Sequence, residues 1–277
     1  MTALITGLSE IASGYDALIC DVWGVIHDGK HAYPAAAEAL IRFRAERGPV
    51  VLLTNAPRLT SEVAAQCAQY GVPEGCYDAI VSSGAAARAE LEKRGADGLP
   101  LYYIGPDKDL PLLAGLGLNF TGIAEAQLVF CTGLEDDLTE TPADYADRLA
   151  AMRARNLTMI CANPDLVVHR GAQLCYCAGA LAKDYEKLGG TATYYGKPYL
   201  PVYDAALKAA GNPKKPLAVG DGLFTDIAGA NRAGLDTLFI GDGVHGEDVL
   251  PFTADHLEKL FAESGVAVTA ASRRLTW

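Results

Sequence analysis

Short apolar runs alternate along the chain with longer stretches that have a helical pattern of apolar and polar residues. We interpret five of the runs as buried strands: ALIC (17–20), VVLL (50–53), AIV (79–81), PLAV (216–219) and TLFI (237–240). Helices are predicted between them over 34–48, 60–71 and 225–234, and glycines end each of these stretches. Strands that alternate with helices in this way predict an α/β fold built on a doubly wound parallel sheet.

A second α/β series interrupts this pattern. It contains the strand-like runs LYYI, LVFC and TMIC and a helical stretch over 142–156. After it, the chain resumes the earlier alternation of strand and loop. We therefore predict two domains, a core formed by residues 1–83 and 191–277 and an inserted α/β cap domain formed by residues 84–190.

Polar side chains follow three of the apolar runs of the core and a fourth run, TATYYG (191–196). Asp21 follows ALIC, Thr54 and Asn55 follow VVLL, Lys197 follows TATYYG, and Asp221 follows PLAVG. Taken singly, each of these residues fits a turn, a cap or a solvated surface. In an open parallel sheet, however, the carboxyl ends of neighbouring strands share one crevice, and ligands bind there. The four positions together therefore predict one functional site.

These residue types indicate phosphoryl transfer to an aspartate. A carboxylate that attacks a phosphate approaches a group that is itself negative, so a cation and fixed donors must offset the repulsion. Asp21, Asp221 and Asp226 offer the oxygen ligands that Mg²⁺ prefers. Lys197 would neutralise the nucleophile, and the Thr54 hydroxyl would hold the phosphoryl group. Aspartate suits the role of nucleophile because water can open the aspartyl phosphate that it forms.

Four segments resemble the motifs of the haloacid dehalogenase-like (HAD) hydrolases. They are DVWGV, LLTN, GKPY and GDGLFTDIAGANRAG, in that order and with the insert between the second and the third. The place of the insert and the phrase NPDLVVHRG resemble class IIA, which includes sugar-phosphate, phosphoglycolate, nucleotide and pyridoxal phosphatases. The resemblance implies a Rossmann-like core with a cap and an Mg²⁺-dependent hydrolase of small phosphate monoesters. It also implies roles for individual residues: Asp21 as nucleophile, Thr54 in phosphate binding, Lys197 as the stabilising cation, and Asp221 and Asp226 at the metal. Asn55 belongs to the same phosphate-binding loop, which we expect it to shape.

The first motif departs from the family pattern at Trp23, where most phosphatases of this family have a second aspartate. That aspartate protonates the leaving alkoxide and later deprotonates the attacking water. An indole can do neither, because its nitrogen is only a donor. General acid–base help contributes about 10²- to 10⁴-fold, so its loss slows the chemistry without abolishing phosphate binding. The backbone carbonyl of Trp23 stays available as a metal ligand.

Three explanations of Trp23 remain open. His27 or Asp28 replaces the missing acid and base, although a turn or cap role in the segment HDG fits either residue equally well. Alternatively, the leaving group departs unprotonated and turnover is slow. In the third explanation, the protein binds a phosphorylated ligand, as a binding or regulatory protein, with little turnover.

A metal-free 2-haloacid dehalogenase is a further alternative, because those relatives also have an aromatic residue two positions after the nucleophile. They lack the acidic metal pair, whereas this chain has Asp221 and Asp226. Carboxylates so close to Asp21 would repel one another unless a cation lay between them. The sequence therefore favours the phosphatase.

Four polar residues follow the TMIC run of the insert: Asn163, Asp165, His169 and Arg170. The resemblance implies that this region of the cap faces the substrate and helps to select it. Arg170 is a candidate for binding a second anionic group, although a surface-loop role is equally consistent.

Two segments near the C-terminus carry weaker signals. The glycines of 241–246 spell G-x-G-x-x-G, but too little chain follows for a nucleotide-binding crossover unit, so we predict a loop that borders the crevice. HLEKLFAESG (256–265) is predicted to be an amphipathic helix. The final AASRRLTW is predicted to be a tail or a partner surface.

The composition of the chain argues against some classes of partner and indicates where in the cell the protein is found. A net charge of −11 argues against nucleic-acid and anionic-membrane partners, because phosphate backbones are bound through clustered Lys and Arg. No apolar run reaches the roughly 18 residues of a membrane span, and the start has no pattern of a signal peptide. Cys20, Cys131 and Cys161 lie inside apolar runs, which is typical of reduced thiols. We therefore expect a cytoplasmic protein with a small phosphorylated metabolite as its partner, and the resemblance implies a homodimer formed through the cap.

Overall fold

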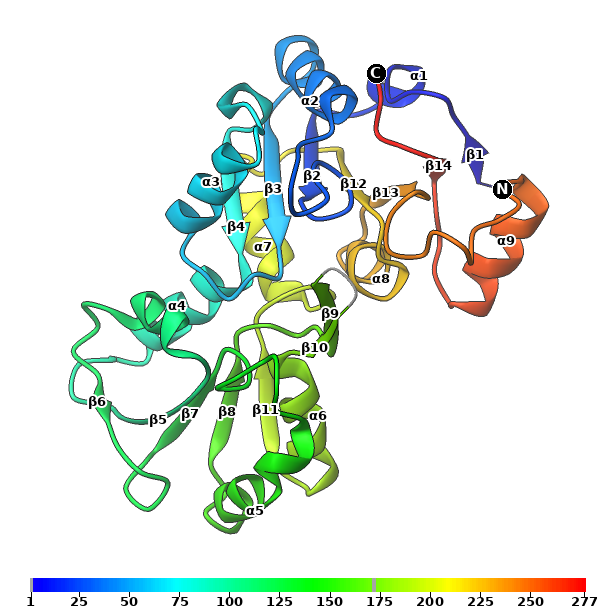
Figure 1. The fold of residues 1–277 in the computed structure, drawn as a ribbon. Helices are drawn as coiled ribbons and strands as arrows, with labels where there is room; N and C mark the ends of the chain where they lie inside the picture. The colour runs from blue at the N-terminus through cyan, green and yellow to red at the C-terminus, as the bar shows by residue number, and fades with distance from the viewer. Residues whose placement is uncertain (1, 171–172) are drawn as a thin grey trace. The chain divides into compact units, whose positions relative to one another are not determined.

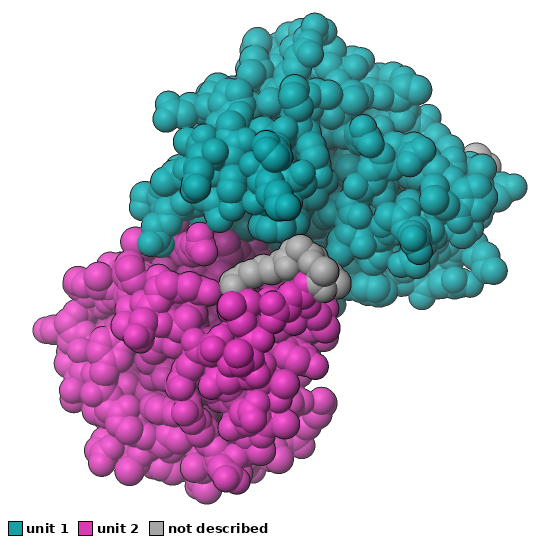
Figure 2. Space-filling view, viewed as in Figure 1, with its two compact units in different colours: residues 1–54, 60–81, 197–277 teal, residues 55–59, 82–196 magenta. Residues whose placement is uncertain are grey.

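A computed structural model describes residues 2–170 and 173–277 of the chain. The chain divides into two compact units, residues 1–54, 60–81 and 197–277 in the first and residues 55–59 and 82–196 in the second (Figure 2). It passes between the units at 54–55, 59–60, 81–82 and 196–197.

A parallel sheet forms the centre of the first unit (Figure 1). In the described residues its strands follow the spatial order β1 (Ala3–Leu4), β14 (Ala270–Ser272), β13 (Asp236–Ile240), β12 (Pro216–Gly220), β2 (Ala17–Asp21), β3 (Val50–Thr54) and β4 (Ala79–Ser82). Strand β12 pairs in parallel with both β13 and β2, and β2 pairs in parallel with β3. The five strands predicted for the core are confirmed, and so is the α/β fold class.

Helices pack against this sheet through apolar side chains. Val202 and Tyr203 of α7 (Leu200–Ala209) and Ala230 of α8 (Ala228–Arg232) share a buried cluster with Ile19 and Val51 of the sheet. The remaining helical elements of this unit are α1 (Ser9–Ala12), α2 (Pro34–Glu46), α3 (Thr60–Gln69), η1 (Glu74–Cys76), the π-helical turn η4 (Leu223–Ile227) and α9 (Ala254–Glu263). The helices predicted over 34–48, 60–71, 225–234 and 256–265 correspond to α2, α3, η4 with α8, and α9.

The second unit has its own parallel sheet, in the order β11 (Thr191–Tyr194), β8 (Thr158–Cys161), β7 (Leu128–Cys131), β5 (Pro100–Ile104) and β6 (Asn119–Phe120). Its helical elements are α4 (Ser83–Lys93), η2 (Asp107–Leu113), η3 (Pro142–Tyr145), α5 (Ala146–Ala154) and α6 (Ala178–Lys187), and β9 (Val167–Arg170) and β10 (Gln173–Tyr176) form an antiparallel pair. Leu91 of α4 packs with Leu101, Phe130 and Ile160 of the sheet in a separate buried cluster. This unit therefore has a core of its own.

The prediction of a tail or partner surface at the C-terminus was wrong. Strand β14 lies inside the core sheet, where Ala270 pairs with Leu238 of β13 on one side and with Ala3 of β1 on the other. The chain beyond it stays against the N-terminal segment, because the Leu8 amide donates to the Thr276 carbonyl at 2.8 Å. A strand of three small residues followed by two arginines has no apolar pattern that would reveal it.

None of the helices in the described part of the chain is both long and apolar enough to cross a membrane. The seven cysteines are free and buried, which confirms the prediction of reduced thiols. Burial raises the pKa of Cys131 to about 12, so its thiol stays protonated and behaves as a small apolar side chain.

Candidate active site

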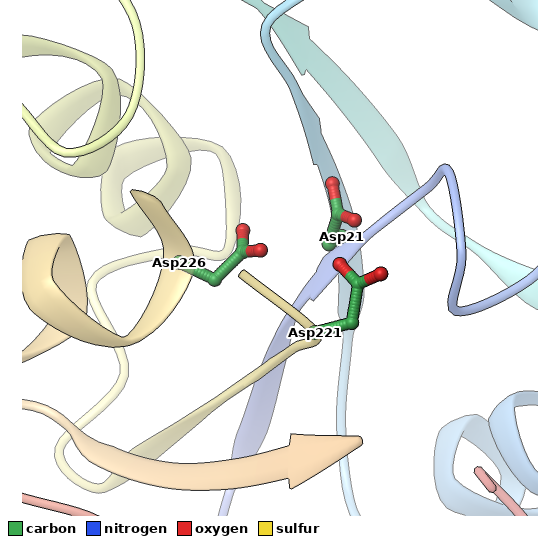
Figure 3. Close-up of side chains that lie close together, drawn as sticks. All are labelled: Asp21, Asp221 and Asp226. Carbon is green, nitrogen blue, oxygen red and sulfur yellow. The ribbon is translucent and has the colours of Figure 1, made fainter. Parts of the chain in front are cut away.

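Three aspartates from separate segments meet at the carboxyl end of the core sheet. Asp21 is the last residue of β2, Asp221 follows β12, and Asp226 belongs to η4. One carboxylate oxygen of each lies within 4.8 Å of those of the other two, and all three residues are buried. In Figure 3 the side chain of Asp226 extends from its helical turn toward the other two carboxylates. Parallel pairing of β2 with β12 produces this arrangement, because it brings both strand ends to the same edge of the sheet.

Lys197 is a buried cation in this cluster and is only 4% exposed. Its Nζ donates to Asp21 Oδ1, lies 2.7 Å from Asp226 Oδ1 and donates to the Leu53 carbonyl at 3.3 Å. Burial by itself would lower the pKa of Lys197, but the charges of Asp21 and Asp226 outweigh burial and raise that pKa well above its ordinary value. The ammonium therefore stays charged, and it binds two of the three carboxylates.

The proximity of the aspartates to one another, together with their burial, raises the pKa of two of them. Burial, followed by the charge of Asp226, raises the pKa of Asp21 well above its ordinary range, although Lys197 acts in the opposite direction. The same two causes raise the pKa of Asp221 to about 6. Buried carboxylates that repel one another in this way bind a divalent cation readily, because the cation removes the repulsion and oxygen is the ligand that Mg²⁺ prefers. The donor set of Asp21, Asp221 and Asp226 therefore fits Mg²⁺.

The loop 241–246 holds the Asp221 carboxylate in place. The Val244 amide donates to Asp221 Oδ2 at 2.7 Å. A Cβ added to Gly243 would lie 2.1 Å from the same oxygen, and one added to Gly24 would lie 2.2 Å from it. Only glycine fits at these two positions, and the loop borders the site as the sequence predicted.

Backbone donors and one imidazole fix the turn that carries Asp226. The Gly222 amide donates to Asp226 Oδ2 at 3.0 Å, and the Tyr203 hydroxyl donates to the Asp226 carbonyl at 2.8 Å. His245 links this turn to the loop 241–246, because its Nε2 accepts from the Leu223 amide at 3.2 Å. Sequence reasoning missed Tyr203 and His245; the glycine-rich pattern around His245 was the one available signal.

Trp23 lies two residues after Asp21 with its indole 51% exposed. A Cβ at Gly29, where φ is +85°, would lie 2.2 Å from the indole, so the ring rests directly on this glycine. The indole also meets the His27 ring edge-on, with 5.6 Å between ring centroids. The indole is thus supported on one side and open on another.

His27 and Asp28, the two candidate substitutes for the missing acid and base, both have turn contacts. The His27 imidazole is buried, and its Nδ1 accepts from the Gly29 amide at 3.1 Å. Burial lowers the pKa of His27, which favours the neutral ring. Asp28 Oδ1 accepts from the amides of residues 30 and 31 at 2.8 Å, and these bonds lower the pKa of Asp28. The catalytic role of either residue stays a prediction.

The other predicted site residues lie on both units. Thr54 ends β3 in the first unit, whereas Asn55 begins a segment of the second unit. The Asn55 side-chain amide donates to Asp165 Oδ1 at 2.8 Å, and the Asp165 backbone amide donates to Asn163 Oδ1 at 3.1 Å. The structure therefore brings Asn55 together with two of the predicted substrate-selecting residues. The structure describes only the backbone of the other two, His169 and Arg170.

The fold and the site together define an α/β protein with a buried acidic cation site at the carboxyl end of a parallel sheet. The chain belongs to the haloacid dehalogenase-like hydrolase family. The family models described as haloacid dehalogenase-like hydrolase and HAD-hydrolase-like match residues 18–119 and 194–264. The membership that the four motifs predicted is confirmed.

Three proteins of known name or structure are similar to this chain over most of its length. Ribonucleotide monophosphatase NagD from Escherichia coli K12 is 30% identical over 90% of this chain and 98% of its own length. The crystal structure of a haloacid dehalogenase-like hydrolase from Brucella suis is 39% identical, with a TM-score of 0.85 over 98% of this chain and 100% of that one. Glycerol phosphate phosphatase from Mycobacterium tuberculosis, solved with magnesium, is 26% identical, with a TM-score of 0.66 over 87% of this chain and 73% of that one.

Proposed function

We propose that this protein is an Mg²⁺-dependent phosphatase that hydrolyses small phosphate monoesters through an aspartyl phosphate on Asp21. The observation that carries the proposal is the buried cluster of Asp21, Asp221 and Asp226 with Lys197 bonded to the first and last of them. Two similar proteins support the reaction class, since they are named as phosphatases of ribonucleotides and of glycerol phosphate.

The metal site of the proposed enzyme consists of oxygen ligands from three segments. Asp21, Asp221 and Asp226 would hold Mg²⁺, together with the backbone carbonyl of Trp23. When bound, the ion would neutralise the carboxylates and the phosphoryl oxygens. The similar phosphatase that was solved with magnesium supports this choice of ion.

The side chains of this chain would carry out the transfer in two steps. Lys197 orients Asp21 and favours its ionised form, and an oxygen of Asp21 attacks phosphorus while the bond to the leaving oxygen breaks. The Thr54 hydroxyl and nearby backbone amides would hold the phosphoryl group in line during this step. Water then attacks the phosphorus of the aspartyl phosphate, and the carboxylate of Asp21 is released together with inorganic phosphate.

The second unit is proposed to act as a cap domain, with residues 84–190 as its predicted extent. A cap excludes water during phosphoryl transfer and helps to select the substrate. Asn163, Asp165, His169 and Arg170 are the residues proposed to select it. A homodimer formed through this cap and a cytoplasmic location stay predictions.

Replacement of Asp21 by asparagine tests the nucleophile. The native protein with Mg²⁺ is expected to release phosphate from a panel of phosphate monoesters, and removal of the metal with a chelator is expected to stop it. Asp21→Asn is expected to lower kcat by at least about 10³-fold, because an amide cannot form the acyl phosphate. Activity that survives this substitution would reject Asp21 as the nucleophile.

A phosphoester-binding protein with little turnover is the second candidate, and the indole at Trp23 favours it, since an acid and base is missing there. Calorimetry with a phosphate ester in Mg²⁺ distinguishes the two functions, because saturable binding without phosphate release supports the binding protein. Halide release from a 2-haloacid in the presence of a chelator would instead support the metal-free dehalogenase, which the cluster of acidic residues disfavours.

A further inference from the structure

We infer that Trp23 selects the leaving group and that the substrates are phosphate monoesters of planar, conjugated hydroxyls of the phenol class. Such a hydroxyl leaves as a stable anion, whereas an alkyl alcohol must be protonated as it leaves. This inference rests on the proposed phosphatase function and names its substrate class.

The charged groups around Asp21 are already engaged. Asp221 accepts from the Val244 amide and Asp226 accepts from the Gly222 amide, and both carboxylates are needed at the metal. The Lys197 ammonium is shared between Asp21 and Asp226. Proton donation to a leaving oxygen would break one of these contacts.

His27 and Asp28 are also unsuited to protonate an alkoxide. His27 Nδ1 already accepts from the Gly29 amide, so this nitrogen cannot donate a proton to a leaving oxygen while the turn contact is kept. The ring is enclosed edge-on by Trp23 at 5.6 Å and by Tyr70 at 5.0 Å, measured between ring centroids. Asp28 is bound to two turn amides, which favour its ionised form. A leaving group that departs without a proton removes the need for an acid.

Exposed apolar side chains stand next to the residues that hold the metal ligands. Trp23 is 51% exposed, Phe224 is 62% exposed and Val244 is 69% exposed. Trp23 precedes Gly24 in the chain, and both Gly24 and the Val244 amide lie against Asp221 Oδ2. Phe224 belongs to η4, two residues before Asp226. A planar ring attached to the phosphate can bury its faces on such side chains, whereas a polyol would gain little from them.

The indole is positioned before any ligand arrives. Gly29 and His27 support it, so a stacking surface forms without the ordering of a mobile side chain. In the transfer, an oxygen of Asp21 forms a bond to phosphorus and the bond from phosphorus to the phenolic oxygen breaks. The electron pair leaves with that oxygen as a phenolate, which no residue needs to protonate. In the second step water attacks phosphorus, the Asp21 carboxylate is released, and the proton of the water passes to the solvent.

The test is a leaving-group series measured on the full chain with Mg²⁺, using 4-nitrophenyl phosphate, phenyl phosphate and glycerol phosphate. We expect kcat/KM to fall by at least about 100-fold from 4-nitrophenyl phosphate to glycerol phosphate. Trp23→Asp is expected to raise kcat on glycerol phosphate by about 10²-fold or more and to change kcat on 4-nitrophenyl phosphate much less, because the new carboxylate supplies the proton.

Two further variants separate stacking from acid–base chemistry. Trp23→Phe keeps an aromatic face without an acid, so it is expected to keep the preference for aryl esters. Trp23→Ala is expected to raise KM for the aryl esters by roughly 3- to 10-fold and to leave KM for glycerol phosphate unchanged. Ile41→Ala removes another exposed apolar side chain of the first unit, on α2, and serves as the control for a general effect of such a loss.

Equal kcat/KM for aryl and alkyl esters would overturn the inference and leave the phosphatase function in place. An unchanged aryl preference in a folded Trp23→Asp variant would do the same, and thermal unfolding of each variant establishes that it is folded. If no ester is hydrolysed in a manner that depends on Mg²⁺ and on Asp21, the proposed function and the inference both fall.

Discussion

At the level of single residues, Lys197 supplies the positive charge that offsets the buried carboxylates of Asp21 and Asp226. It is buried with Asp21 and Asp226, and desolvation of such a group is compensated only while its partners are present. The same lysine opposes the rise in the pKa of Asp21 that burial and Asp226 cause, so it favours the ionised carboxylate beside two further carboxylates.

Replacement of Lys197 by methionine is expected to destabilise the metal-free protein by about 3 to 5 kcal/mol, because it leaves buried carboxylates without a cation. Urea unfolding measures the loss, and added Mg²⁺ is expected to restore part of it. Lys187→Met is the matched control, since that side chain is 75% exposed and its pair with Asp184 is a surface salt bridge. A change of less than 1 kcal/mol, as expected for the control, would contradict a central role of Lys197.

At the level of elements, the ends of the strands could be predicted from the sequence and the loops that surround them could not. Asp21, Lys197 and Asp221 follow apolar runs, and the rule that parallel strands end at one edge of a sheet is sufficient to bring them together. The bond from Asn55 to Asp165 joins residues 110 positions apart, and no local pattern predicts such a pair. Strand β14 is missing from the prediction for the same reason, since its partners β13 and β1 define it more than its own three residues do.

The loop 241–246 provides a test at this level. Gly243→Ala places a methyl group where Asp221 Oδ2 now lies, at 2.1 Å, so the loop or the carboxylate must move. We expect weaker Mg²⁺ binding by at least about tenfold, measured by calorimetry or by the Mg²⁺ dependence of phosphate release. Gly246→Ala is the control in the same loop, because its nearest neighbour lies at an ordinary contact distance of 3.6 Å. Equal Mg²⁺ affinity in the two variants would show that the loop does not position Asp221.

At the level of the whole molecule, the stability of the fold is expected to depend on metal binding at the acidic cluster and on the pH. The three aspartates come from β2, from the residue after β12 and from η4, so the site exists only when the core sheet is assembled. A cation that binds this assembled site and not the unfolded chain stabilises the fold by mass action. Protons compete with the cation for the same carboxylates, because burial and mutual repulsion raise the pKa of Asp221 and of Asp21 in the folded state.

This competition predicts opposite effects of pH with and without metal. The pKa of Asp221 is about 6 in the folded protein against an ordinary 3.8, so the folded state binds the proton more tightly than the unfolded chain between these values. In a chelator, this residue therefore makes the free energy of unfolding decrease as the pH rises from about 4 to 6, by up to about 3 kcal/mol, and the decrease ends above pH 6.

Mg²⁺ is expected to reverse the trend, since the carboxylates bind it once they lose their protons. At a concentration of 1,000 times its Kd it stabilises by about 4.1 kcal/mol, which exceeds the loss of about 3 kcal/mol, and this gain should be complete only above pH 6. Urea unfolding at a series of pH values, with chelator and with Mg²⁺, measures both effects, and Asp221→Asn isolates them because the amide does not titrate. If the native protein and Asp221→Asn show the same pH dependence in the chelator, Asp221 is not the group that makes the free energy of unfolding depend on pH.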